Sequence, residues 1–89
     1  MEKIRRHIIF FGYVQGVGFR YRASFAARHY GLSGWVRNCS DGSVEMEAEG
    51  TEADITAVIG ALQQNPWAQI DRIASERIPV QNDRSFEIR

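Results

Sequence analysis

Residues 43–63 read SVEMEAEGTEADITAVIGALQ, and this stretch contains the change in hydrophobic period that decides the fold. In its first part apolar residues alternate with glutamates, which predicts a strand over residues 43–50 with one buried face and one face in water. From Thr51 onward apolar residues recur every three or four positions, which predicts an amphipathic helix with Asp54 in a shortened capping box. The apolar positions are Val44, Met46 and Ala48 in the strand and Ile55, Val58, Ile59 and Leu62 in the helix.

Shorter patterns predict the elements on either side of this unit. A strand over residues 34–38 is expected to pair with residues 43–50, because Asp41-Gly42 between them is typical of a tight hairpin turn. The other elements are expected as strands at residues 7–14, 70–78 and 85–89 and as a helix at residues 21–30 that Gly31 ends. The order β-α-β-β-α-β with a short C-terminal strand is typical of an α+β, ferredoxin-like sandwich. In that fold two helices cover one face of a mainly antiparallel sheet.

Length and composition limit the architecture further. The chain has 89 residues, of which 44% are hydrophobic and 25% charged, so we expect a single domain over residues 1–89. The one cysteine, Cys39, can neither close an internal disulfide nor supply a cysteine-based zinc site. The apolar run at residues 8–11 is too short for a signal peptide or a membrane span, so we expect a cytoplasmic protein. Its small size and the lack of a long apolar surface stripe predict a monomer.

The formal net charge of zero conceals two oppositely charged halves. Residues 1–40 carry seven Lys or Arg and one Glu, whereas residues 41–89 carry four Arg and ten Asp or Glu. Ten of the eleven basic residues are arginine, whose planar guanidinium binds oxyanions through two parallel hydrogen bonds. Two interpretations remain open. Either the fold interleaves the halves so that their fields cancel, or the first half holds an anion site.

The segment GYVQGVGFR at residues 12–20 is the densest candidate for such a site. Gly16 and Gly18 allow sharp backbone turns, so successive amide groups can converge on an anion beside the positive end of the following helix. Arg20 comes where the loop meets the helix and can fork onto two phosphate oxygens. The alternative interpretation is an ordinary strand-to-helix turn with a solvated arginine. A Walker A loop is excluded because no Gly-Lys-Ser/Thr follows.

Asn38, at the end of the strand over residues 34–38, is the second candidate. Its carboxamide has one acceptor and two donors, so it can orient a water molecule without titrating. An asparagine at this place can equally well start the hairpin turn, and the local sequence alone favours that interpretation.

We expect no metal site among the remaining residues. His7 and His29 lie in different predicted elements and have no partner at ligand spacing. Alternate residues of a strand splay along one face without converging, so Glu45, Glu47 and Glu49 are expected on a solvated face. The large aromatic residues expected in or near the core are Tyr13, Phe19, Phe25, Trp35 and Trp67.

Taken together, the two candidate segments resemble the acylphosphatase family at both of its characteristic motifs. These are QGVGFR at residues 15–20 and GWVRN at residues 34–38, followed by DGSVEMEAEG at residues 41–50. The order of the motifs, the 18 positions between Arg20 and Asn38 and the order of the elements are also similar. The resemblance covers residues 5–89, and two long motifs at a fixed separation make it specific.

The resemblance implies hydrolysis of the carboxyl–phosphate anhydride of a small acyl phosphate, without metal or cofactor, to give a carboxylate and inorganic phosphate. It assigns positioning of the attacking water to Asn38. It assigns phosphoryl binding to the backbone amides of the loop and the side chain of Arg20. The phosphate-binding residues are then Gln15, Gly16, Val17, Gly18, Phe19 and Arg20.

This chemistry needs few groups. A departing carboxylate has a conjugate acid with a pKa of about 4, so it needs no proton from a general acid at neutral pH. Phosphoryl transfer depends mostly on positioning and charge stabilisation. We expect neither a carboxylate nor a histidine at the proposed site, which leaves a phosphate oxygen of the substrate as the candidate acceptor of the water's proton.

Two other function classes remain as alternatives. An RNA-binding domain can share this order of elements, but its third strand would carry basic and aromatic residues where this chain has SVEMEAE. We therefore expect no nucleic acid as a partner. The short apolar run at residues 8–11 leads us to expect no membrane as a partner either. The second alternative is a non-catalytic module on the same scaffold that binds phosphate or carbamoyl phosphate. The presence of both Arg20 and Asn38 favours the enzyme.

Overall fold

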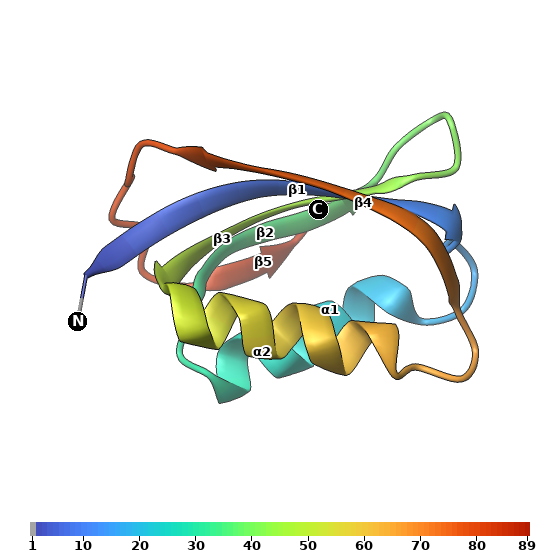
Figure 1. The fold of residues 1–89 in the computed structure, drawn as a ribbon, viewed down its shortest axis with the longest axis horizontal. Helices are drawn as coiled ribbons and strands as arrows, with labels where there is room; N and C mark the ends of the chain where they lie inside the picture. Colours follow the sequence, from blue (N-terminus) through green and yellow to red (C-terminus); the bar gives the residue numbers. More distant parts are fainter. Residues whose placement is uncertain (1) are drawn as a thin grey trace.

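Five strands form one mixed sheet, and two helices cover one of its faces (Figure 1). The computed structural model describes residues 2–89. The elements are β1 (Lys3–Tyr13), α1 (Phe19–His29), β2 (Ser33–Asn38), β3 (Val44–Thr51), α2 (Glu52–Gln63), β4 (Gln69–Ile78) and β5 (Phe86–Ile88). The strand order is β4-β1-β3-β2-β5, in which β2 and β5 run parallel and the other neighbouring pairs are antiparallel. The expected ferredoxin-like arrangement with a short C-terminal strand is confirmed.

The change of hydrophobic period gives the expected boundary between β3 and α2. β3 ends at Thr51, whose Oγ1 accepts a hydrogen bond from the backbone amide of Asp54 at 3.2 Å and so caps α2. The helix ends at Gln63, shortly before Pro66. Its fully buried residues are Ile55, Val58 and Leu62, three of the four that the spacing predicts.

α1 begins at Phe19 rather than at residue 21, because Gly18 at its N-cap already turns the chain with a φ of 74°. The helix ends at His29, and Gly31 follows in the left-handed conformation, as predicted. Phe19 packs edge-on against Phe10 of β1, with the ring centroids 5.0 Å apart. This contact fixes the start of α1 over β1 and so determines where the loop between them lies.

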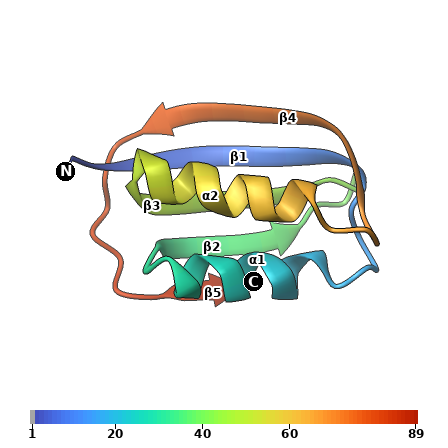
Figure 2. The same ribbon diagram turned by 60° about the horizontal axis from the view of Figure 1, so that its bottom comes forward.

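Buried apolar residues of the helices and of one face of the sheet form the core. Figure 2 shows both helices lying over that face of the sheet. The alternating residues of β3 point into the core as predicted, and Val44, Met46 and Ala48 are fully buried. Ile8 and Phe10 of the neighbouring β1 join them. β1 and β3 therefore form a packed base from which the β1–α1 loop and the β2–β3 hairpin extend at the same end of the sheet.

The opposite face of the sheet is not the solvated surface that the glutamates of β3 predict. Arg5 of β1 is fully buried there, where its Nε donates to Glu47 at 2.7 Å and its Nη1 donates to Glu49 at 3.2 Å. Glu49 is 2% exposed and also accepts the backbone amides of Gln81 and Asn82 at 2.7 and 2.9 Å. The expectation is wrong because the β4–β5 connection supplies a cover that strand alternation alone does not reveal.

The prediction for the large aromatic residues is confirmed in part. Phe19 is buried and Trp35 is half-buried. Tyr13, Phe25 and Trp67, in contrast, are 66%, 70% and 66% exposed. For these three the prediction is wrong because they lie at the end of β1, along the open groove between α1 and α2 and in the turn after α2, where most of each side chain stays in solvent.

Candidate functional site

The loop between β1 and α1 adopts the backbone conformation that its glycines predict. Gly16 and Gly18 have φ values of 75° and 74°, a left-handed region that side chains other than glycine disfavour. Within the described chain, no side chain caps the first turn of α1 and no acidic residue lies in it. The amides at this helix start are therefore available to an anion, and the positive end of the helix favours one there.

A pocket of about 200 Å³ lies at this helix start. Its walls bring together Arg20 from α1 and Asn38 from the end of β2, although 18 positions separate them in the sequence. Since a water molecule occupies roughly 30 Å³, the pocket has room for a tetrahedral phosphoryl group with water beside it. Five of the predicted site residues line it, namely Gly16, Gly18, Phe19, Arg20 and Asn38.

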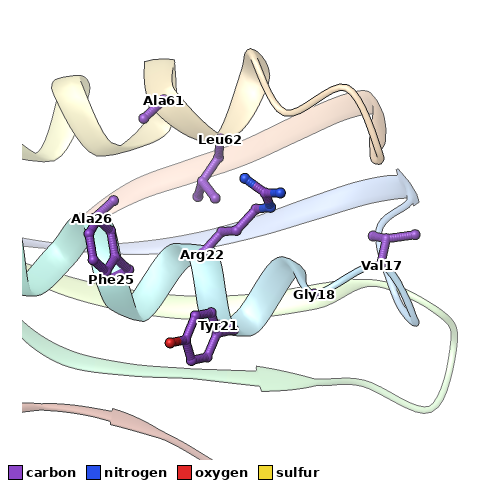
Figure 3. Close-up of a pocket in the computed structure, with 8 residues that line it drawn as sticks. All are labelled: Val17, Gly18, Tyr21, Arg22, Phe25, Ala26, Ala61 and Leu62. Atoms are coloured by element: carbon purple, nitrogen blue, oxygen red, sulfur yellow. The ribbon is translucent and has the colours of Figure 1, made fainter.

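The other two predicted residues, Gln15 and Val17, do not line this pocket. Val17 lies at one end of a groove between α1 and α2, where Arg22 extends toward Leu62 (Figure 3). The side chain of Gln15 turns to the β2–β3 hairpin and donates from Nε2 to the carbonyl oxygens of Cys39 at 2.7 Å and Ser43 at 2.8 Å.

Arg20 is half-buried, and its Nη1 donates to the main-chain oxygen of Arg89 at 3.2 Å. Among residues 2–89 it takes part in no ion pair. Four other cations of the basic half pair with carboxylates of the acidic half, whereas Arg22 and Arg28, like Arg20, take part in no ion pair within residues 2–89. The pairs are Lys3 with Glu49, Arg5 with Glu47 and Glu49, Arg6 with Glu52, and Arg37 with Glu45. Charges of the two halves thus cancel along the sheet, as the first interpretation of the charge asymmetry expects, and the anion site in the first half stays a prediction.

Asn38 is the last residue of β2 and pairs with Val44 across the hairpin. The polar contacts that close the hairpin loop come from other residues. Asp41 Oδ1 accepts the backbone amide and the hydroxyl of Ser43, at 2.9 and 2.6 Å. The Ser43 hydroxyl, followed by its amide, lowers the pKa of Asp41 from its usual value. Since Asp41 and Ser43 hold the turn, the interpretation of Asn38 as a turn-forming residue loses its main support.

A second, more open cleft of about 640 Å³ adjoins the pocket and shares Arg20 and Asn38 with it. Trp35 forms part of its wall, and the guanidinium carbons of Arg37 and Arg89 lie 5.9 and 5.1 Å from the centroid of its ring. Sequence reasoning missed this cleft. Part of the cleft could have been predicted, because the register of the expected hairpin places Arg37 opposite Glu45.

The cleft also contains a carboxylate, which corrects the expectation that none lies at the site. Glu45 accepts Arg37 Nε at 2.6 Å and lies 2.6 Å from His7 Nε2. The hydrogen bond with His7 lowers the pKa of Glu45, and Arg37 adds to the effect against the opposing influence of burial. A carboxylate held in its ionised form by two partners is a weak proton acceptor.

In residues 2–89, no three His, Cys, Asp or Glu side chains are grouped so as to hold a metal ion. None of the helices there is long and apolar enough to cross a membrane.

Comparisons with known proteins agree on one family. A family model described as Acylphosphatase matches residues 6–88. A curated acylphosphatase of Bifidobacterium longum is 43% identical over an alignment of 89 positions, which covers 97% of this chain and 92% of that protein. The crystal structure of an acylphosphatase from Bacillus subtilis matches with a TM-score of 0.90 at 34% identity, over 96% of this chain and 97% of that one. The crystal structure of T. kodakarensis HypF matches with a TM-score of 0.83 at 42% identity, over 96% of this chain but 12% of that one.

Proposed function

The chain belongs to the acylphosphatase family, whose members hydrolyse acyl phosphates, and we propose how its own residues carry out that reaction. The phosphoryl group occupies the pocket of about 200 Å³ at the start of α1. Backbone amides of the loop residues that line it, Gly16, Gly18 and Phe19, and the guanidinium of Arg20 bind its oxygens, and the uncapped helix start adds a favourable field. The observation that carries the proposal is that Arg20 and Asn38, from distant parts of the sequence, line this one pocket.

In this mechanism the carboxamide of Asn38 holds a water molecule in line with the bond to be broken. The water oxygen attacks phosphorus, the bond between phosphorus and the bridging oxygen breaks, and the acyl group leaves as a carboxylate. One proton of the water passes to a phosphate oxygen, which gives inorganic phosphate. The leaving carboxylate is a weak base, so no general acid is required.

The proton goes to the substrate rather than to Glu45. That carboxylate lines the adjoining cleft, but its two hydrogen-bonded partners lower its pKa and make it a poor base. Positioning and charge stabilisation then supply the rate enhancement, as is general for phosphoryl transfer.

We further propose that residues 1–89 act as a single-domain, cytoplasmic monomer that needs no metal, cofactor, membrane or nucleic acid. On the sheet face opposite the helices, Glu45, Glu47 and Glu49 of β3 pair with His7, Arg37 and Arg5, so this strand presents carboxylates where an RNA-binding sheet carries aromatic and basic residues. Light scattering at several protein concentrations tests the monomer, and a mass of twice 10.1 kDa would contradict it.

One alternative is a module that binds a phosphate-containing ligand without turning it over, since the chain is also similar to part of a full-length HypF whose structure is of a phosphate- and nucleotide-bound form. In that comparison a chain like this one makes up 12% of a larger protein. A module of that kind needs the loop at residues 15–19, which we call the anion loop, and Arg20. It does not need a water held by Asn38.

Release of inorganic phosphate from benzoyl phosphate, measured with EDTA present, separates these functions. The enzyme is expected to turn over many equivalents of substrate, and the chelator should not change the rate. Tight phosphate binding without turnover would support the binding module. Loss of activity with EDTA would contradict the metal-free mechanism.

A further inference from the structure

Gln15 makes a contact that the proposed mechanism does not yet use. It lies at the start of the anion loop, and its Nε2 donates to the carbonyl oxygens of Cys39 at 2.7 Å and Ser43 at 2.8 Å. Those two carbonyls form the neck of the hairpin loop that begins directly after Asn38. One half-buried side chain therefore ties the loop assigned to phosphoryl binding to the hairpin that carries the residue assigned to water positioning.

The contact is specific for a primary amide. Each carbonyl also accepts a backbone amide within the hairpin, since Cys39 O accepts Gly42 N at 3.2 Å and Ser43 O accepts Cys39 N at 2.9 Å. Gln15 supplies the second donor to both, and the NH₂ group of a carboxamide has two N–H bonds to give. A carboxylate at the same place has only acceptor atoms, so it cannot donate a hydrogen bond to either carbonyl oxygen.

Apart from Gln15, the anion loop is held by the packing of Val14 and Val17 against the core. Gly16 and Gly18 have no side chains, and an added Cβ at either would meet nothing within 4 Å. The packing of Phe19 fixes the loop at its far end, where α1 begins. The near end, at Gln15, is held to the rest of the site through the hairpin.

We propose that Gln15 is a positioning residue that sets the distance between the bound phosphoryl group and the water held by Asn38. This inference rests on the proposed function, and it places the role of the Gln15 side chain in alignment rather than in contact with the phosphate. Misplacement of reacting groups by about 1 Å can cost 10²-fold in rate. The two hydrogen bonds from Gln15 to the hairpin carbonyls are called the Gln15 clamp. Loss of this clamp should therefore reduce kcat more than it reduces affinity for phosphate.

The test uses two variants of nearly the same size, Gln15→Glu and Gln15→Met. Both are expected to lower kcat for benzoyl phosphate about 10–100-fold at pH 7.5, with KM and the phosphate dissociation constant within about threefold of the parent. Gln15→Glu should in addition recover several-fold, relative to the parent, as the pH falls toward 5. The two carbonyl oxygens raise the pKa of the introduced carboxyl, and once protonated it donates one hydrogen bond. Gln15→Met has nothing to protonate and should not recover.

The controls separate alignment from stability and from direct binding. Gln63→Glu changes an exposed glutamine of α2 in the same way and should leave every parameter unchanged. The parent profile, measured in parallel, accounts for any pH dependence that the variants share with the parent, including that of the substrate and of the contacted loop, which carries Asp41 and Cys39. Circular dichroism at each pH shows that the variants are folded, and Gln15→Met keeps the test valid where Gln15→Glu does not fold.

Three results would overturn the proposal. Normal kcat in both folded variants would make the clamp purely structural. Loss of phosphate affinity as large as that of Arg20→Lys would place the side chain on the substrate. A Gln15→Glu profile parallel to that of Gln15→Met would show that donation to the carbonyls is not what matters. Failure of the proposed function is distinguishable, because the parent itself would then release no phosphate.

Discussion

At the scale of single residues, Arg20 leads to the first prediction. Its guanidinium is half-buried and already donates to the main-chain oxygen of Arg89, so its head group is held beside the pocket. Arg20→Lys keeps the charge but loses the two-pronged geometry. We expect phosphate affinity to fall about 10–100-fold, the equivalent of one charged hydrogen bond, and most of the activity to be lost. Calorimetric titration with phosphate measures the first effect.

Arg22→Lys is the matched control for this prediction, because Arg22 is exposed on the same helix and faces the groove toward α2 (Figure 3). It should leave phosphate affinity unchanged. Equal affinity in Arg20→Lys and the parent would remove Arg20 from the phosphoryl site.

A second prediction at this scale compares two glycines that both have open space around an added Cβ. Gly16 has a φ of 75°, whereas Gly60 lies within α2. Gly16→Ala should destabilise the chain by about 1 kcal/mol through backbone strain and weaken phosphate binding. Gly60→Ala should stabilise it by about 0.5–1 kcal/mol and leave binding unchanged. Urea unfolding and phosphate titration check both, and a Gly16→Ala variant with parental affinity would contradict the anion loop.

Glu45 provides a third prediction, on the identity of the base. Its pKa is lowered by His7 and by Arg37, so Glu45→Gln should keep kcat for benzoyl phosphate within about threefold of the parent. The measurement is a pH–rate profile for both proteins. If kcat fell 100-fold and the rate of the variant no longer decreased toward acidic pH, Glu45 would instead be identified as the base.

At the scale of elements, the buried pair of Arg5 and Glu49 connects β1, β3 and the β4–β5 connection. Burial alone would raise the pKa of Glu49, but the amides of Gln81 and Asn82 and the Arg5 guanidinium outweigh it and hold the pKa below its usual value. A carboxyl with a lowered pKa in the folded state stabilises the fold above its unfolded pKa, near 4.5. That contribution is lost as the pH falls from there through the lower folded value.

The fourth prediction follows from this linkage. Glu49→Gln should lower the free energy of unfolding at pH 7 by about 3 kcal/mol, the lower end for breaking a buried pair, because Glu47 and Asp83 still contact Arg5. The difference between variant and parent should shrink as the pH falls below about 4.5. Urea unfolding at pH 7 and pH 3.5 measures it. A difference that is the same at both pH values would show that ionisation of Glu49 does not stabilise the fold.

The elements show where sequence reasoning succeeds and where it cannot. The β3–α2 boundary is predictable because its signals, the change of period and the Thr51 cap, are local. The covered face of the sheet is not, because Gln81 and Asn82 reach Glu49 from more than thirty positions away. Alternation of apolar and acidic residues does not distinguish a glutamate in water from one held by a buried arginine.

At the scale of the whole molecule, the pocket with Arg20 and Asn38 could be anticipated from two motifs whose spacing is fixed. The adjoining cleft could not. Arg89 reaches it because β5 runs parallel to β2 and delivers the end of the described chain beside Trp35, and no local pattern encodes that pairing. The Gln15 clamp could not be predicted from the sequence either, because its partners are backbone carbonyls, which every residue has.

The central claim is that one group, Arg20 with its loop, binds the phosphoryl group and another, Asn38, positions the water. The Asn38→Ala variant tests this claim most directly. The hairpin should stay folded, because Asp41 and Ser43 close its turn. We expect kcat for benzoyl phosphate to fall about 10²–10³-fold, the usual effect of deleting one preorganised polar contact, with the phosphate dissociation constant within about threefold of the parent. A near-normal kcat, or a loss of phosphate affinity equal to that of Arg20→Lys, would contradict the claim.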